Sequence, residues 1–494
     1  MNTFQKFYNY IKGVIGKMFS RNTIQSALNI DIAISSDMVN AMELFEKIYT
    51  NEAPWLKERQ VESLELGASI ANEFARLTTL EMQSEVTGSA RADYLNSVYK
   101  EMLKNLNEKL EVGNAMGGLI FKPYVKNQKI YIDFVKPSCF YPTEFNSSKE
   151  IIAGIFVSQL TKGKYIYTRL EYHKFYEIAR DDEVSYTIKN VVYRSDTTSV
   201  LGTQIKLEDV AEWKNLSPVT NIKYITKPLF AYYKVPGANN IDIESPLGVS
   251  VYTKAIKLIK DADIQYGRID WEYEASEKAI YVDEEAARKG KGKINFFVNR
   301  LKDRLYKKLD TGKSDFFEDY SPEIRDEAFW RGFNKILQRI EFNVGLAYGT
   351  LSDPNYVDKT ATEIKASKQR SYATVSQMQK NLQTALEHLI YAINVLCSLY
   401  NLAPEGDYQV SFNWDDSLVV DAEKEQTLQM QEVGQGLRSK IKYIMYRYGL
   451  TEEQAKKELE IINQERMKSQ EAFGIISKDF EEWYYAYTRA MESN

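Results

Sequence analysis

Residues 245–400 predict three helices in a row, and the third is too long for one small domain. It begins with a capping-box pattern, Thr360-Ala-Thr-Glu363, and continues without proline or glycine to about Tyr400. At 1.5 Å per residue, such a helix is roughly 60 Å long. A helix of that length exceeds the core of a small domain, which favours a structural element of a larger assembly.

The two helices before it are predicted from their first residues. Ser245-Pro246 and Ser321-Pro322 each combine an N-cap serine with a proline at the first helical position. Apolar residues follow the first pair at helical spacing, and Glu323 and Asp326 suit the first turn of the second helix. The sequence therefore predicts a helix from Ser245, a basic loop, and a helix from Ser321.

The rest of the chain predicts a mixed α+β fold. Residues 24–112 read as helical, whereas residues 113–235 contain runs with the two-residue alternation of β-strands. We expect an antiparallel meander with a turn at Asp181-Asp182 and strands at Lys129–Val135, Lys164–Tyr172 and Val184–Tyr193. A last strand, Tyr408–Trp414, is isolated in sequence, and we expect it to return to this earlier sheet.

Composition limits the classes of function. The chain has 494 residues and a net charge of −5, which argues against a protein that grips nucleic acid over a broad basic face. Its two cysteines, Cys139 and Cys397, cannot make a disulfide framework and are expected as buried thiols. No targeting signal or membrane span is expected, because the richest apolar run, Leu389–Leu402, is too short.

The sequence contains little that resembles a catalytic or cofactor-binding motif. No glycine spacing suits a phosphate-binding loop, and the two histidines, His173 and His388, have no cysteine or histidine at ligand spacing. We therefore expect no cofactor, no metal and no enzyme activity. The acidic pairs Asp415-Asp416 and Glu318-Asp319 could bind Mg²⁺ for phosphodiester chemistry, but such pairs are more often caps or solvated charges.

Two loops are candidates for binding. Residues 347–359 connect the second and third helices, with Gly345 and Gly349 as candidate hinges. The basic loop interleaves aromatic rings with cations, which suits an acidic protein partner first and DNA second, while a solvated loop is the plain alternative. Its cations are Arg288, Lys289, Lys291, Lys293, Arg300, Lys302, Arg304, Lys307, Lys308 and Lys313.

Several short stretches, in this order and spacing, resemble the portal proteins of long-tailed double-stranded DNA bacteriophages, the head-tail connectors. They are Pro54-Trp-Leu56, Ser69–Leu77, Phe121-Lys-Pro-Tyr124, Ser245–Ser250 and Thr360–Ile364 with the helix after it. The resemblance implies a portal fold with a mixed wing domain, paired stem helices, a clip, a tunnel loop, a long spine helix and a helical crown.

On this resemblance the chain divides into eight segments. They are an N-terminal helix (1–23), the α+β wing (24–244), a stem helix (245–278), the clip (279–321), a second stem helix (322–346), the tunnel loop (347–359), the long helix with the wing return strand (360–420) and the crown (421–494).

The resemblance also implies a function and partners. The chain would form a homo-oligomeric ring, typically a dodecamer, at one capsid vertex of the virion, after synthesis in the host cytoplasm and without a membrane partner. Double-stranded DNA would pass through it, without sequence specificity, during packaging and ejection. Terminase would dock on the clip, later replaced by head-completion or adaptor proteins, and the major capsid and scaffold proteins would surround the ring.

Individual residues follow from this mapping. Leu351, Asn355, Tyr356 and Lys359 are expected near DNA in the tunnel loop, and Lys254, Lys257 and Lys260 on the channel side of the stem. The cations of the basic loop would serve docking on the clip. The alternative function is a nuclease of the packaging machinery that uses Asp415 and Asp416, and a third is a helical scaffold or adaptor without a pore.

Overall fold

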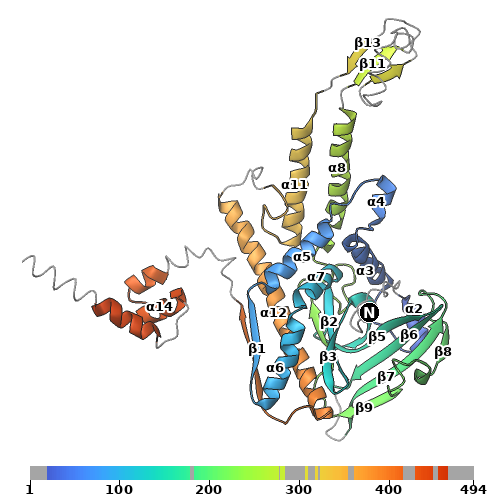
Figure 1. Cartoon of the computed structure of the whole chain (residues 1–494), viewed down its shortest axis with the longest axis vertical. Helices are drawn as coiled ribbons and strands as arrows, with labels where there is room; N and C mark the ends of the chain where they lie inside the picture. The colour runs from blue at the N-terminus through green and yellow to red at the C-terminus, as the bar shows by residue number, and fades with distance from the viewer. Residues whose placement is uncertain are drawn as a thin grey trace, which may run out of the picture. The chain divides into compact units, whose positions relative to one another are not determined.

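The computed structural model describes residues 19–177, 183–276, 279–283, 306–309, 317–320, 323–353, 361–414, 429–448 and 454–464. The side chains of 279–283, 306–309, 317–320 and 361–365 are left aside. The described residues form a mixed fold of helices and sheets, as the α+β prediction requires (Figure 1). The chain divides into two compact units, Met1–Trp414 and Asp415–Asn494.

The first unit begins with a helical layer that contains one strand. Ser35 caps α3, because its hydroxyl accepts the N–H of Met38 at 3.2 Å. The predicted helical region is thus confirmed except for β1. The elements are α2 (Arg21–Leu28), α3 (Ser36–Tyr49), α4 (Pro54–Arg59), α5 (Leu66–Thr79), β1 (Met82–Gly88), α6 (Ala90–Leu103) and α7 (Leu106–Met116).

Two antiparallel sheets follow. One has the order β10-β2-β3, and the other has the order β4-β5-β6-β7-β8 with β9 paired to β7. The predicted meander is confirmed, and Lys129–Val135 is a strand at the predicted bounds. The turn predicted at Asp181-Asp182 lies outside the described residues. The elements are β2 (Gly118–Lys126), β3 (Lys129–Val135), η1 (Pro137–Cys139), β4 (Phe140–Phe145), β5 (Ile151–Lys162), β6 (Tyr165–Phe175), β7 (Val184–Ser195), β8 (Thr203–Ile205), η2 (Leu207–Asp209), β9 (Val219–Lys223) and β10 (Ala231–Lys234).

The last strand of the first unit, β14 (Tyr408–Trp414), has an unexpected partner. It pairs antiparallel with β1 along its whole length, from Met82 opposite Trp414 to Gly88 opposite Tyr408. The prediction that it joins the sheet of residues 113–235 is therefore wrong. The cause is spatial: the chain leaves the long helix beside α6 and β1, and the side chains of both strands pack against that helix.

The three predicted helices are present with different starts. The first, α8 (Ile256–Ala275), follows a short 3-10 turn, η3 (Thr253–Ala255), so the predicted start at Ser245 is wrong. Ser245 lies in a turn instead, where its N–H donates to the Asp242 carboxylate at 3.2 Å. The second, α11 (Asp326–Val344), begins after a non-helical stretch at 323–325 rather than at Ser321.

The segment between α8 and α11 is more than a loop. It contains a three-stranded sheet in which β11 (Ala279–Asp283) pairs parallel with β12 (Tyr306–Leu309) and antiparallel with β13 (Phe317–Tyr320). Residues 284–305, which hold most of the predicted basic loop, lie outside the described residues.

The third helix, α12 (Ala361–Leu399), is 39 residues long, or about 58 Å, which confirms the predicted rod. By length and composition, its stretch Ala366–Leu399 could cross a membrane, and 44% of that apolar window is buried. Inside this fold its apolar side packs on β2, β10 and α5. The buried apolar side chains of this helix are Val375, Met378, Leu382, Ala385, Leu386, Leu389, Ile390, Ala392, Ile393 and Cys397.

The second unit is helical where it is described. Its helices cover residues 429–434, α14 (Lys440–Tyr448) and residues 454–464. Helical structure in this part was predicted from the sequence.

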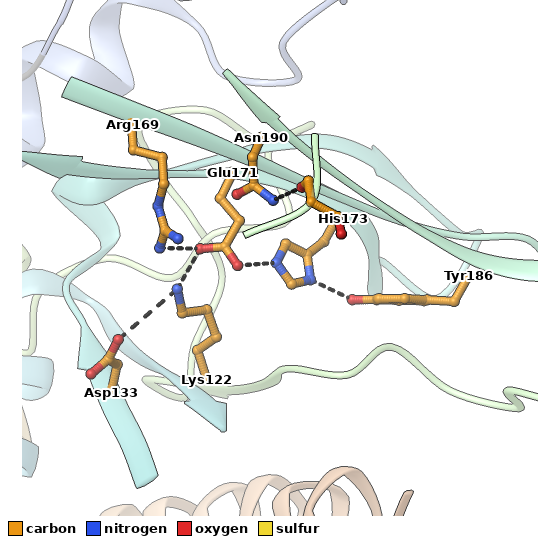
Figure 2. Close-up of polar contacts among 8 residues, drawn as sticks. Lys122, Asp133, Arg169, Glu171, His173, Tyr186 and Asn190 are labelled. Atoms are coloured by element: carbon orange, nitrogen blue, oxygen red, sulfur yellow. Dashed lines mark hydrogen bonds and ion pairs between the residues drawn. The ribbon is translucent and has the colours of Figure 1, made fainter. Parts of the chain in front are cut away.

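A buried ionic cluster joins the two sheets of the first unit (Figure 2). The Glu171 carboxylate of β6 accepts hydrogen bonds from Lys122 of β2 at 2.6 Å and from Arg169 at 2.7 Å. His173 lies 3.1 Å from the same carboxylate and 2.8 Å from the Tyr186 hydroxyl of β7. A neutral imidazole that donates to Glu171 and accepts from Tyr186 satisfies both contacts.

The environment of the cluster shifts the pKa of both acid-base groups downwards. Burial, opposed by the nearby Glu171, lowers the pKa of His173 from its usual 6.5. Burial alone would raise the pKa of Glu171, but the charges of Arg169 and Lys122 hold it well below 4.5. Because both pKa values are lower in the folded chain, the unfolded chain binds protons at a higher pH than the folded chain does. The free energy of unfolding therefore decreases as the pH falls.

We predict that His173→Gln makes stability less dependent on pH. The His173 contribution is complete above pH 6.5 and decreases as the pH falls below that value, because the unfolded chain is then protonated first. Between pH 7 and pH 5.5 the melting temperature of the variant should therefore fall less than that of the wild type.

His388, whose pKa burial also lowers, contributes the same way in both proteins and cancels in this comparison. An equal fall in the melting temperatures of wild type and variant between pH 7 and pH 5.5 would contradict the prediction.

Candidate functional site

The helices α8 and α11 lie side by side and share an apolar seam. The ring of Tyr266 on α8 lies 6.0 Å from Phe333 and 6.3 Å from Trp330, both on α11. Such edge-to-face and tilted aromatic contacts stabilise a helix pair beyond the area that they bury. The other buried residues of the seam are Ile259, Ala262, Ile269, Leu337, Ile340 and Val344.

Polar contacts fix both ends of this pair. At the end next to β11, Arg325 donates two hydrogen bonds to Glu272, at 3.0 and 2.9 Å, and these bonds lower the pKa of Glu272. At the other end, the Asn343 side chain donates to the carbonyl of Lys254 at 3.2 Å. The two helices are therefore held in one register.

A buried carboxylate also anchors α8 to α4 and to the segment after it. Asp263 accepts the indole N–H of Trp55 at 2.8 Å and the backbone N–H of Leu64 at 3.0 Å. One turn further along, a side chain on Gly267 would come within 2.7 Å of Val61. Burial raises the pKa of Asp263, although both hydrogen bonds act in the opposite direction.

The loop after α11 is tied down as far as Asp353. Glu341 is fully buried, and one carboxylate oxygen accepts the N–H groups of Leu351 at 2.6 Å and Ser352 at 2.8 Å. The other oxygen accepts the Ser352 hydroxyl at 2.9 Å. Asn334, two turns earlier on α11, accepts the N–H of Asp353 at 2.9 Å. The chain thus enters residues 354–360 from a fixed point.

Gly345, predicted as a hinge, ends α11. Its φ of +90° is in the left-handed region, and its N–H donates to the carbonyl of Glu341 at 3.0 Å. A Cβ at this position would approach the Thr374 hydroxyl to 2.6 Å. Glycine is therefore required here by both conformation and space.

The predicted site residues are only partly described. Leu351 is half-buried at the anchored loop, Lys254 lies in η3, and Lys257 and Lys260 lie on α8, with the first two lysines exposed. Among the docking cations, Lys307 and Lys308 lie in β12. Asn355, Tyr356, Lys359, Arg288, Lys289, Lys291, Lys293, Arg300, Lys302, Arg304, Lys313, Asp415 and Asp416 lie outside the described residues.

Sequence reasoning missed Glu341 and Asn334. Both lie on the buried face of α11, seven residues apart, among Leu337, Ile340 and Val344. Polar residues at core positions of an amphipathic helix need partners, and this pattern was the available signal. Within the described part of the chain, no three His, Cys, Asp or Glu side chains are grouped to hold a metal ion.

The profile of the family described as "Phage portal protein, SPP1 Gp6-like" matches residues 91–472, well over half of the chain. The chain belongs to this phage portal protein family. A portal protein has a structural role in the phage particle, as an oligomeric ring at the capsid vertex. The family is not one of enzymes.

A solved chain described as "Neck of native GTA particle computed with C12 symmetry" is similar to this portal protein. The match covers 87% of this chain and 99% of the other, at 9% sequence identity and a TM-score of 0.40. No curated protein sequence matches.

We predict that Glu341→Gln loosens the anchored loop of this portal protein. A neutral amide oxygen replaces a carboxylate that accepts three hydrogen bonds, and a charged acceptor contributes about 1.5–3 kcal/mol. Hydrogen exchange at the amides of Leu351 and Ser352 should therefore accelerate about tenfold or more.

Glu327→Gln is the matched control, since Glu327 is exposed on the first turn of the same helix. Unchanged protection of both amides in Glu341→Gln, or equal acceleration in the control, would contradict the anchoring role.

Proposed function

We propose that this protein forms the ring, typically a dodecamer, through which double-stranded DNA is packaged and ejected. Family membership carries the proposal. Residues 24–244 with the strand of 360–420 would be the wing, 245–278 and 322–346 the stem, 279–321 the clip, 347–359 the tunnel loop and 421–494 the crown. These assignments follow the order of elements in this chain.

The α8–α11 pair supports the stem assignment. A conduit for a moving polymer needs walls that do not bend, and this pair is held by its aromatic seam, by Arg325–Glu272 and by Asp263. The anchored stretch before residue 354 supports the tunnel-loop assignment, because it holds the start of the segment in one place. Asn355, Tyr356 and Lys359 are the proposed DNA-proximal residues of that loop.

Partners follow from the same proposal. Terminase would dock on the clip through its cations, including Lys307 and Lys308, and head-completion proteins would follow it there. Major capsid and scaffold proteins would surround the wing. The alternative, a packaging nuclease that uses Asp415 and Asp416, would cleave DNA in the presence of Mg²⁺.

The first test is the mass and shape of the purified protein, by light scattering and negative-stain imaging. Rings of about twelve subunits with a central hole would support the proposal. A chain that stays monomeric and cleaves DNA with Mg²⁺ would refute it.

We predict that replacing Asn355, Tyr356 and Lys359 together by alanine leaves ring assembly intact and lowers the amount of DNA packaged or retained. The change spares the anchor residues Glu341 and Asn334, so the stem should fold as before. The measurement is packaged DNA per particle, with ring formation as the control. Normal packaging by this variant would remove the loop from the proposed conduit.

A further inference from the structure

Beyond its first turn, which exposes Asp326 and Glu327, the free face of α11 carries charge of one sign. Arg331, Lys335 and Arg339 recur at every fourth position, so they lie along one side of the helix about 6 Å apart. All three are exposed, and none makes an ion pair with a described residue. After its first turn, the only carboxylate of α11 is Glu341, which is buried on the opposite side. We refer to these three side chains as the α11 stripe.

An arginine–aromatic stack continues the stripe at the root of the loop. The guanidinium of Arg339 lies 5.0 Å from the centre of the Phe342 ring, and that of Arg370 on α12 lies 4.2 Å from the same ring. Arg370 also lies 6.0 Å from the ring of Tyr348. Cation–π contacts of this kind hold guanidinium groups in place, and the N–H donors of the exposed Arg339 suit phosphate oxygens.

The stripe is poorly suited to a contact between subunits. Protein interfaces bury apolar and aromatic side chains at their centre and are depleted of unpaired charges. One large apolar side chain, Phe342, lies beside the stripe; it is 41% exposed, and two arginines lie against its ring. The exposed side of α8 fits a protein partner better, since Trp271 is 64% exposed there and acids accompany its cations. These acids are Asp261, Asp270 and Glu274.

We propose that the α11 stripe, with Arg339 and Arg370 ordered on Phe342, contacts the phosphates of double-stranded DNA. The inference rests on the proposed function and names the helix that meets the DNA. Exposed cations on a rigid helix bind phosphates without reading bases, so the contact is independent of sequence and screened by salt. A few such cations in an otherwise acidic protein guide a duplex without gripping it.

The test is binding of a fluorescent 30-base-pair duplex to the full-length protein between 50 and 200 mM salt. Arg331, Lys335 and Arg339 are changed together to glutamine. The slope of log affinity against log salt should become shallower by about 0.9 for each phosphate that the variant no longer neutralises, and affinity at 50 mM salt should fall about tenfold or more. Phe342→Leu, which keeps the charges but removes the stack, should weaken binding by a smaller factor.

The matched control changes Lys57, Lys100 and Lys129 to glutamine. These lysines are exposed on other elements, and their replacement alters the net charge by the same amount. An unchanged salt slope in the stripe variant, or an equal change in the control, would overturn the inference. If the proteins still form rings of normal mass, the proposed function would not be affected by that result. Absence of rings in the stripe variant alone would assign the stripe to the subunit interface and also overturn it.

A wild-type chain that never forms rings would count against the proposed function instead. The duplex-binding comparison still decides the inference in that case, because the whole stripe lies within one subunit.

Discussion

A carboxylate removed from water must be hydrogen-bonded, and the first unit of this protein depends on three that are. Glu171 joins two sheets through Lys122, Asp263 joins α8 to residues 55–64, and Glu341 joins α11 to residues 351–352. Each carboxylate connects two segments that apolar contacts alone would not hold in one alignment. Directional hydrogen bonds to the buried charge fix the position of one segment relative to the other.

The long helix α12 makes these separate parts one unit. Its buried apolar residues belong to three hydrophobic cores. Val375 and Met378 contribute to the core shared with α8 and α11, Leu382, Cys397 and most residues between them to the core around β1, β2 and β14, and Ala392 to a smaller core around Tyr186. A shorter helix would reach fewer of these cores. The length of α12, which the sequence predicts, thus allows one helix to pack against both the start of the 347–359 loop and the sheets.

Charge is distributed in a way that suits the conduit that we propose. The chain as a whole is acidic, with a net charge of −5, yet beyond its first turn α11 exposes three cations and no acid. Broad positive charge would hold DNA by releasing many counterions at once, and would oppose its movement. A narrow stripe on a fixed helix is compatible with weak, repeated contacts, as we propose for the α11 stripe and DNA.

Periodicity in the sequence was enough to locate elements whose partners are close by. The meander of β5, β6 and β7 was predictable because each strand alternates and pairs with its neighbour in the chain. The sequence also determined the rod of α12 and the α+β class, since both follow from local patterns. The family was recognisable from the order of short motifs such as Ser245–Ser250, even though α8 begins later than Ser245 suggests.

Contacts between distant residues were decided only by the tertiary structure. The pairing of β14 with β1 depends on where α12 ends in space, and α11 begins at Asp326, beyond Arg325, whose side chain bonds to Glu272 on α8. Glu341 reads in the sequence as one more helical glutamate, and burial alone makes it an anchor. Local propensity fixes which residues form a helix or strand, but the burial that gives a polar side chain its role exists only after the chain has folded.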